Sequence, residues 1–239
     1  LHAGYSPEST TNSCAVPLYK TSSFVFNNTE HAANLFGLRE LGNIYTRLMN
    51  PTTDVLEQRV AAMEGGAAGL GIASGTSAVF YSIINIAQEG DEIVSANNLY
   101  GGTYTQFNDI LPKFGIKVKF VDPNDPANFA AAITEKTKAV FCESVSNPGL
   151  DVADIKAIAN VADDHGIPLI VDSTFSTPYL TNPIEHGASI VIHSLTKWMG
   201  GHGNGIGGVV VDSGTFNWKN GNFPLYDEPD NSYHGLRWG

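Results

Sequence analysis

Asp172 and Lys197 are the two residues of this sequence whose types and setting best suit chemistry. Pyridoxal phosphate needs such a pair, because a lysine forms a Schiff base with its aldehyde and a carboxylate pairs with its pyridinium nitrogen. Ser194 and Thr196 flank the lysine and carry hydroxyls that can donate hydrogen bonds to a phosphate. Together the four residues predict a binding site for pyridoxal phosphate.

Two short strands must position these residues. The runs from Pro168 to Val171 and from Ser189 to His193 are rich in Ile and Val and show no alternation of polar and apolar residues. This pattern is typical of parallel strands that are covered on both faces. Ligands of open α/β sheets bind beyond the carboxyl ends of the strands. Asp172 and Lys197, each just past a strand, are therefore expected to share one crevice.

Each of the four residues also has an ordinary structural interpretation. Asp172 could be a turn residue and Lys197 an exposed surface lysine, since most charged residues are simply exposed. Ser194 and Thr196 could form a helix cap. The combination of all four favours the cofactor site.

A glycine-rich run follows the lysine and matches the pattern G-x-G-x-x-G at Gly203, Gly205 and Gly208. That pattern indicates dinucleotide binding where it opens a helix. Here it precedes an apparent strand at residues 209–211. We therefore reject a dinucleotide fingerprint, and the position argues against the remote alternative of a non-catalytic nucleotide-binding module.

Two further stretches lie just beyond predicted strands. Ser74-Gly75-Thr76-Ser77 opens a helix, and such a turn presents free N–H groups and the positive end of the helix dipole to an anion. A plain strand-to-helix turn capped by serine explains the same residues equally well. Tyr100 could stack on a flat cofactor, or it could be an ordinary core tyrosine.

Strands and helices alternate through the chain and predict a doubly wound, mostly parallel α/β sheet with helices on both faces. The strand at 70–73 is expected to be buried, and Thr52 or Thr53 is expected to cap the helix that ends at Gly65-Gly66. We expect strands at 70–73, 92–96, 116–121, 138–143, 168–171, 189–193 and 209–211, and helices at 54–64, 74–87, 103–111, 126–134 and 152–165.

Residues 1–40 are polar, rich in Ser, Thr and Asn, and without clear periodicity. They predict an irregular N-terminal arm that lies across a partner subunit. Residues 41–239 then form one large domain.

Composition excludes several classes of function. The 239 residues are 42% hydrophobic and 15% charged, with no apolar run long enough to span a membrane. The net charge of −11 argues against a nucleic-acid partner. Cys14 and Cys142 lack metal or redox spacing, the histidines show no paired ligand spacing, and no signal peptide opens the chain. These features predict a cytoplasmic protein with reduced thiols and no metal site.

The run S-L-T-K-W-M-G-G-H-G-N-G-I-G-G-V-V-V-D from Ser194 to Asp212 resembles the Cys/Met-metabolism family of pyridoxal-phosphate enzymes. This run, and the segments F-N-W, F-P-L-Y and S-Y-H-G-L between Phe216 and Leu236, are most similar to the O-acetylhomoserine sulfhydrylase branch. The resemblance covers essentially the whole chain. It implies a type I pyridoxal-phosphate transferase fold, similar to aspartate aminotransferase.

The resemblance also assigns residues to the phosphate of the cofactor. Gly75 and Thr76 match the family's phosphate loop. Tyr45 and Arg47 match positions that reach the phosphate of the adjacent subunit's cofactor. An arginine fork suits a phosphate, although on the sequence alone Arg47 is as well explained by a surface ion pair.

Around the cofactor ring, the resemblance implies that Tyr100 stacks on the pyridine and helps with proton transfer. Asn147 matches a residue close to the ring oxygen, and Thr174 matches the D-x-[TN] arrangement next to Asp172. The catalytic residues implied are Lys197, Tyr100 and Asp172. Val145 departs from the proline that the family more often has at its position.

Activity and assembly are also implied by the resemblance. The expected reaction is a γ-replacement that converts O-acetyl-L-homoserine and sulfide to L-homocysteine and acetate. The alternatives within the family are a cystathionine γ-synthase or a C–S lyase acting on cystathionine or methionine, and the run from Gly200 to Gly203 favours the sulfhydrylase. The expected assembly is a homodimer or homotetramer with shared active sites. The family's C-terminal domain, with its arginine for the substrate carboxylate, is expected to be absent from this chain, and that role is not transferred to Arg237.

Overall fold

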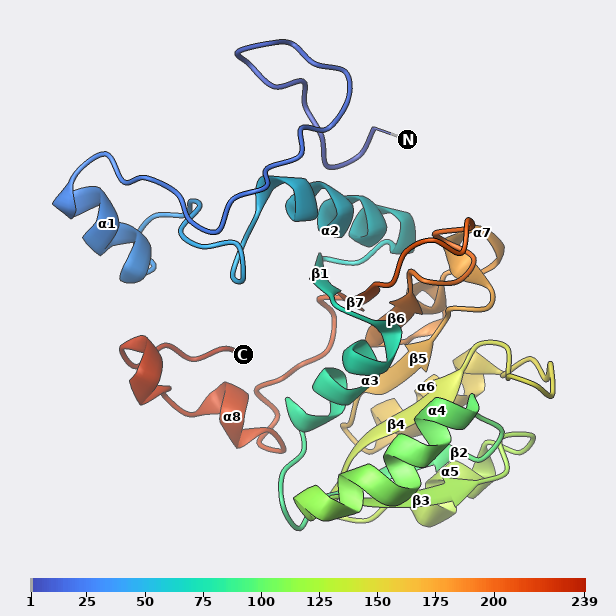
Figure 1. Cartoon of the computed structure of the whole chain (residues 1–239). Helices are drawn as coiled ribbons and strands as arrows, with labels where there is room; N and C mark the ends of the chain where they lie inside the picture. The colour runs from blue at the N-terminus through green and yellow to red at the C-terminus, as the bar shows by residue number, and fades with distance from the viewer. Residues whose placement is uncertain (1) are drawn as a thin grey trace.

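A computed structural model describes residues 2–239 and shows one sheet of seven strands with helices on both faces (Figure 1). The strand order across the sheet is β1-β7-β6-β5-β4-β2-β3. Strands β2 to β6 are parallel, and β7 runs antiparallel to both of its neighbours. The doubly wound, mostly parallel sheet predicted from the sequence is confirmed. The strands are β1 (Ala68–Ile72), β2 (Glu92–Ala96), β3 (Lys117–Val121), β4 (Thr137–Glu143), β5 (Leu169–Asp172), β6 (Ile190–Ser194) and β7 (Gly208–Asp212).

Helices connect the strands and cover the sheet, with α3 and α4 on one face and α5 and α6 on the other (Figure 1). The α-helices are α1 (Thr29–Phe36), α2 (Pro51–Glu64), α3 (Gly75–Ile84), α4 (Gly101–Thr105), α5 (Ala127–Ala132), α6 (Ile155–Asp164), α7 (Thr177–Leu180) and α8 (Pro224–Asp227). Helix α4 continues into a π turn and a 3₁₀ turn, and two further 3₁₀ turns lie at 183–186 and 231–233.

The core of the domain is the central strands of the sheet. Nearly every apolar residue of β4, β5 and β6 is fully buried, as their unbroken Ile, Val and Phe runs predict. Burying each such side chain stabilises the fold by about 1.5–3 kcal/mol. The ends of these strands are therefore rigid supports for whatever side chains follow them.

Strand β1 differs from its predicted burial. It lies at the edge of the sheet and pairs only with β7, and Leu70 is 56% exposed. Helix α2 packs along β1, and the Glu57 carboxylate accepts the Gly71 N–H at 2.7 Å. The apolar run was misleading because an edge strand can be apolar without being covered on both sides.

Helix caps explain where α2 begins and ends and where α3 begins. Asn50, rather than Thr52 or Thr53, caps α2 by accepting the Thr52 N–H at 2.9 Å, and Pro51 occupies the first helical position. The helix ends where Gly65 adopts a φ of 73°, as predicted. Ser74 caps α3 by accepting the Ser77 N–H at 3.1 Å.

The N-terminal arm is not wholly irregular, so that prediction is wrong for residues 29–36. There α1 forms, because Asn28 accepts the His31 N–H at 2.8 Å and Glu30 lies in the first turn, where the helix dipole favours a negative charge. The arm projects away from the sheet (Figure 1). Within residues 2–239, no helix has the length and apolar character needed to cross a membrane.

Candidate active site

A cavity of about 590 Å³ opens at the carboxyl ends of β4, β5 and β6. Its walls come from loops and helix ends that are far apart in the sequence, and strand–helix winding brings them to one edge of the sheet. Every predicted cofactor residue except Tyr45 and Arg47 lines this cavity. The predicted residues that line it are Gly75, Thr76, Tyr100, Asn147, Asp172, Thr174, Ser194, Thr196 and Lys197.

Asp172 presents one carboxylate oxygen to a ligand. Its Oδ1 accepts the Thr174 N–H at 3.0 Å and the Thr174 hydroxyl at 2.6 Å. No donor among residues 2–239 binds Oδ2. Burial raises the pKa of Asp172, and the bonds from Thr174 and the nearby His193 offset only part of this effect. A cationic group beside Oδ2 would remove the penalty on the charged form.

Thr174 links the aspartate to the strand that carries the lysine. Besides donating to Asp172, its hydroxyl accepts the Ser194 N–H at 2.8 Å. This one hydroxyl therefore fixes the ends of β5 and β6 relative to each other. The hydroxyl is thus engaged by protein groups, and Thr174 also lines the cavity, as the resemblance implies for a residue near the cofactor ring.

Lys197 is available for a ligand. Its side chain is exposed along the cavity and forms no ion pair within residues 2–239. The turn that carries it is held by the Lys197 N–H donating to Ser194 O at 3.2 Å and the Gly201 N–H donating to Lys197 O at 2.9 Å. The lysine thus has a fixed backbone and a free amine.

Donor groups suited to an anion lie at the start of α3, in the same cavity as Lys197. Gly75 and Thr76 are the first helical residues, so their N–H groups have no acceptor within the helix. Gly75 is required because a Cβ there would lie 2.5 Å from the Cβ of Ser194. The close approach brings the Ser194 hydroxyl and the helix end together, as a phosphate site needs.

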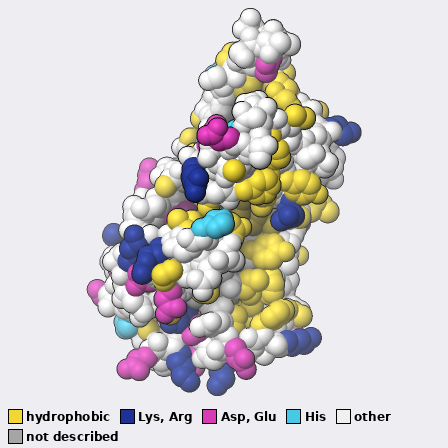
Figure 2. All heavy atoms as spheres, turned by 90° about the vertical axis from the view of Figure 1, so that its left-hand side faces the viewer, with side chains coloured by type: hydrophobic (Ala, Val, Ile, Leu, Met, Phe, Trp, Pro, Cys, Tyr) yellow, Lys and Arg dark blue, Asp and Glu magenta, His cyan; other side chains and the backbone are white. Residues whose placement is uncertain are grey.

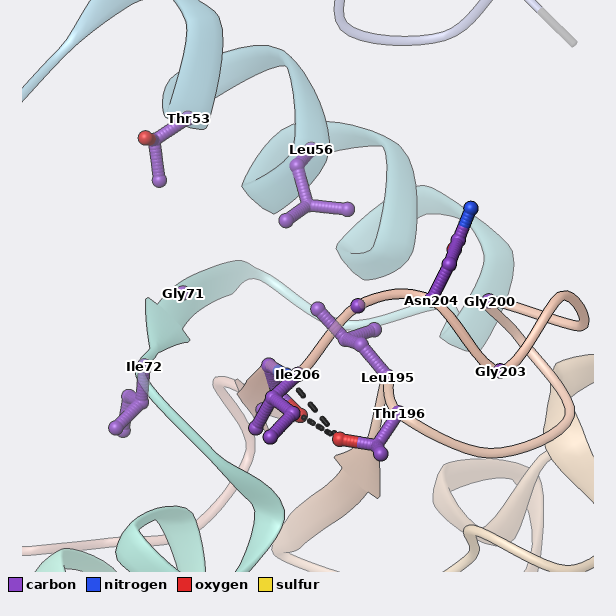
Figure 3. A pocket seen from close by; sticks show the side chains of 13 residues that line it. Thr53, Leu56, Gly71, Ile72, Leu195, Thr196, Gly200, Gly203, Asn204 and Ile206 are labelled. Atoms are coloured by element: carbon purple, nitrogen blue, oxygen red, sulfur yellow. Dashed lines mark hydrogen bonds between the residues drawn. The ribbon is translucent and has the colours of Figure 1, made fainter.

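Thr196 holds the glycine-rich loop rather than pointing freely into the cavity. Its hydroxyl donates to Gly207 O at 3.3 Å and accepts the Gly207 N–H at 3.2 Å (Figure 3). Behind this loop lies a second cavity of about 430 Å³, walled by Thr53 and Leu56 of α2 and by the edge strand β1 (Figure 3). Thr196, Gly203 and Ile206 line both cavities, so the loop separates them.

Glu143 is a further residue of the cavity, and it is absent from the residues predicted above. It ends β4 in register with Asp172, lines the cavity and is only 7% exposed. Burial raises the pKa of Glu143 to about 8, the Asp172 carboxylate contributes in the same direction, and hydrogen bonds from the Tyr100 and Asn147 N–H groups oppose it. The signal was present, because an acid at the end of an apolar strand is the same pattern that identified Asp172.

The raised pKa of Glu143 predicts a pH dependence of stability. Between about pH 4.5 and 8 the folded protein binds a proton that the unfolded chain does not, so this group's contribution falls as the pH rises, by up to about 1.4 kcal/mol per pH unit. The free energy of unfolding, measured with urea on the cofactor-free protein at pH 5 to 9, should therefore decline less steeply with pH in Glu143→Gln than in the wild type. Glu92→Gln should not change this slope, since Lys119 lowers the pKa of Glu92. An unchanged slope in Glu143→Gln would contradict the shift.

Tyr45 and Arg47 lie outside the cavity of their own chain. Tyr45 is 42% exposed, and the Arg47 guanidinium carbon lies 5.5 Å from the centre of the Tyr45 ring. Tyr45 is held by an isolated bridge with Ser23 in the arm. The structure does not bring this pair to the other predicted residues.

The cavity fits pyridoxal phosphate on the chemistry of its donors. It offers a helix N-terminus for the phosphate, an aromatic ring at Tyr100, a free carboxylate oxygen on Asp172 and a free amine on Lys197. Its volume lies in the usual range for small-ligand sites. No group of His, Cys, Asp and Glu in the described part of the chain is arranged to hold a metal ion.

Comparison with known protein families identifies the family of this chain. Residues 1–227 match the family described as Cys/Met metabolism PLP-dependent enzyme. The chain belongs to this family. Pyridoxal phosphate is the family's cofactor, and the expected type I fold is confirmed by solved structures.

Two curated relatives show to which members of the family the chain is similar. The chain is 58% identical to the O-acetyl-L-homoserine sulfhydrylase of Leptospira meyeri, over 99% of this chain and 54% of the relative. It is 54% identical to the homocysteine synthase of Schizosaccharomyces pombe, over 99% of this chain and 56% of the relative. The chain therefore spans about half the length of the curated relatives it matches.

A solved protein of Campylobacter jejuni, described as an O-acetylhomoserine (thiol)-lyase, superposes with a TM-score of 0.97 at 43% identity, over 100% of this chain and 60% of that one. It carries an N′-pyridoxyl-lysine-5′-monophosphate. Cystathionine gamma-lyase of Lactobacillus plantarum superposes with a TM-score of 0.82 at 37% identity, over 89% of this chain and 53% of that one. The fold is thus shared by members with different reactions.

Proposed function

We propose that the protein catalyses γ-replacement on O-acetyl-L-homoserine, with sulfide as nucleophile, to give L-homocysteine and acetate. The observation that carries the proposal is that relatives named O-acetylhomoserine sulfhydrylase or homocysteine synthase are 54–58% identical over nearly the whole chain. The cavity supports it, since it gathers the donors that a pyridoxal-phosphate reaction needs.

The chain's own residues would act as follows. Bound pyridoxal phosphate would supply an electron sink for the substrate's α-carbon. The N–H groups of Gly75 and Thr76, with the Ser194 hydroxyl, would hold the phosphate. Asp172 Oδ2 would accept a hydrogen bond from the ring nitrogen and favour its protonated form, and Tyr100 would supply an aromatic ring beside the cofactor.

Lys197 is the proton carrier of the proposed reaction. Its free amine removes a proton from the substrate's Cα and then one from Cβ, and after the exchange at Cγ it returns one proton to Cβ and one to Cα. Acetate leaves from Cγ, and sulfide forms the new C–S bond at the same carbon. Atoms and charge balance, because hydrosulfide replaces acetate.

Product analysis tests the reaction and separates it from its alternatives. The full-length natural protein should convert O-acetyl-L-homoserine and sulfide to homocysteine and leave cystathionine and methionine unchanged. Cystathionine formed from cysteine in place of sulfide would indicate a cystathionine γ-synthase. α-Keto acid released from cystathionine or methionine would indicate a C–S lyase, and either result would overturn the sulfhydrylase assignment.

The proposal includes an assembly with shared sites, a homodimer or homotetramer. Tyr45 and Arg47 lie outside their own cavity. The arm and the residue after it expose large apolar side chains that have no cover in one chain: Leu18, Val25 and Phe36 in the arm and Leu41 just after it are 60–95% exposed. Hydrophobic side chains gather in a band that descends from this arm (Figure 2). A second copy of the chain would cover the band, and its cavity would receive Tyr45 and Arg47.

The proposal also includes a cytoplasmic location. The exposed free thiol of Cys14 supports a reducing compartment.

Mixing two inactive variants tests the shared site. Arg47→Ala and Lys197→Ala subunits should each be inactive, but in a hybrid dimer one site carries both defects and the other carries neither. Activity should return to about a quarter of wild type when half of the dimers are hybrid. Mixing Lys197→Ala with Asp172→Asn is the control that should restore nothing, because both residues line the same cavity. If exchange occurs without recovery in the first mixture, Arg47 does not serve a neighbour.

A further inference from the structure

Glu143 joins the two loops that bring Tyr100 and Asn147 into the cavity. Its Oε1 accepts the Tyr100 N–H at 2.7 Å, and its Oε2 accepts the Asn147 N–H at 3.2 Å. The Tyr100 loop follows β2, and the Asn147 loop follows β4. A single side chain therefore sets the position of a ring on one loop relative to an amide on the other.

Only a carboxyl group can fill this role at its site. Each of its oxygens can accept an N–H, whereas a glutamine of the same length carries a donor at one of the two positions. That donor would face a backbone N–H in a nearly closed environment, and one of the two bonds would be lost. A protonated carboxyl keeps both acceptors, because its O–H can turn away from the N–H groups.

The backbone beneath Glu143 is fixed by a group of buried hydroxyls. Ser144 follows Glu143 and Ser173 follows Asp172. The Oγ of Ser176 forms hydrogen bonds with both, at 2.8 Å to Ser144 and 2.7 Å to Ser173. All three serines are buried. Hence the two acids stand on strand ends that are tied to each other, and the Glu143 carboxylate cannot drift from the loops it binds.

We propose that Glu143 is a positioning residue that holds Tyr100 and Asn147 in place for pyridoxal phosphate by accepting one backbone N–H from each. The inference rests on the proposed function for the cofactor site. Its consequence is that Glu143 acts on how the cofactor is held without touching the reacting atoms. Loss of one of its bonds releases Tyr100 or Asn147 from its fixed place.

The test compares two glutamate-to-glutamine variants of the full-length holoenzyme. Glu143→Gln is matched by Glu92→Gln, at the opposite end of the sheet, where the carboxylate is also buried and pairs with Lys119 Nζ at 2.7 Å. Three quantities are measured on each: the dissociation constant of pyridoxal phosphate, the circular dichroism of the bound cofactor per mole bound, and the thermal midpoint. Glu143→Gln should weaken cofactor binding about ten- to a hundredfold and lower the dichroism of the cofactor that remains. Glu92→Gln should lower the thermal midpoint and leave both cofactor readouts unchanged.

A third variant keeps the test decisive if Glu143→Gln folds poorly. Glu143→Asp retains two acceptors but is one methylene shorter, so it should fold and show an intermediate loss of dichroism. Unchanged affinity and dichroism in a folded Glu143→Gln or Glu143→Asp protein would overturn the positioning role, as would equal effects in Glu92→Gln. A wild-type protein that binds no pyridoxal phosphate would overturn the proposed function, and this inference with it. If the wild type binds the cofactor, unchanged Glu143 variants count against the positioning role alone and not against the proposed function.

Discussion

Replacing Lys197 by alanine should abolish covalent attachment of pyridoxal phosphate and all turnover, while the fold stays intact. The Lys197 side chain is exposed along the cavity and forms no ion pair within residues 2–239, so its removal leaves no buried group unpaired and no hole in the core. A change of less than about 0.5 kcal/mol in unfolding free energy is expected. Borohydride treatment followed by mass spectrometry should find a pyridoxyl group on Lys197 of the wild type and on no residue of the variant.

Lys156→Ala provides the matched control. Lys156 is an exposed lysine on α6 and lines neither cavity, so this variant should keep the label and the activity. A Lys197→Ala protein that is still labelled at another lysine would show that the cofactor is held elsewhere.

The sequence contained enough to predict the central part of the fold and the position of the site. Strands β4, β5 and β6 are buried on both faces, so their apolar runs mark both the element and its end. Once the strands are parallel, topology alone places the residues after them at one edge of the sheet. Asp172 and Lys197 could therefore be placed together without knowledge of any contact.

Contacts between side chains and backbone could not be predicted in the same way. The bonds from Glu143 to two loops and from Thr174 to Ser194 join residues that are between 4 and 43 positions apart, and no periodicity encodes them. The same holds for Thr196, whose hydroxyl is used by Gly207. Burial of β1 was also mispredicted, because composition does not tell an edge strand from a central one.

The N-terminal arm shows a second reason why parts of the structure could not be predicted from the sequence. Helix α1 is only eight residues long, and its main signal is the side-chain cap at Asn28, which a search for apolar periodicity overlooks. Tyr45 and Arg47 do not line the cavity of their own chain. A sequence can suggest that such residues act on a neighbour only through resemblance, because the neighbour's surface is not encoded in local pattern.

Asp172→Asn should reduce turnover far more than it weakens retention of the cofactor. The Asn carbonyl can take over the two bonds that Thr174 donates to Oδ1, which leaves the amide NH₂ at the place of Oδ2. An NH₂ group donates a hydrogen bond and cannot accept one from a protonated ring nitrogen, so the ring loses its proton and much of its power to withdraw electrons.

The size of the effect follows from the lost charge-assisted bond. Its loss is worth at least about 1.5–3 kcal/mol, which corresponds to a fall in kcat of about ten- to a hundredfold or more. The proposed phosphate contacts from Gly75, Thr76 and Ser194 are unchanged in this variant, so the cofactor should remain bound in equilibrium dialysis. Asp163→Asn, which changes an exposed acid on α6, is the control and should match wild type in both measurements. Wild-type turnover in Asp172→Asn would rule out Asp172 as the partner of the ring nitrogen, because no other carboxylate in the cavity except Glu143 could replace it, and both Glu143 oxygens already accept backbone N–H groups.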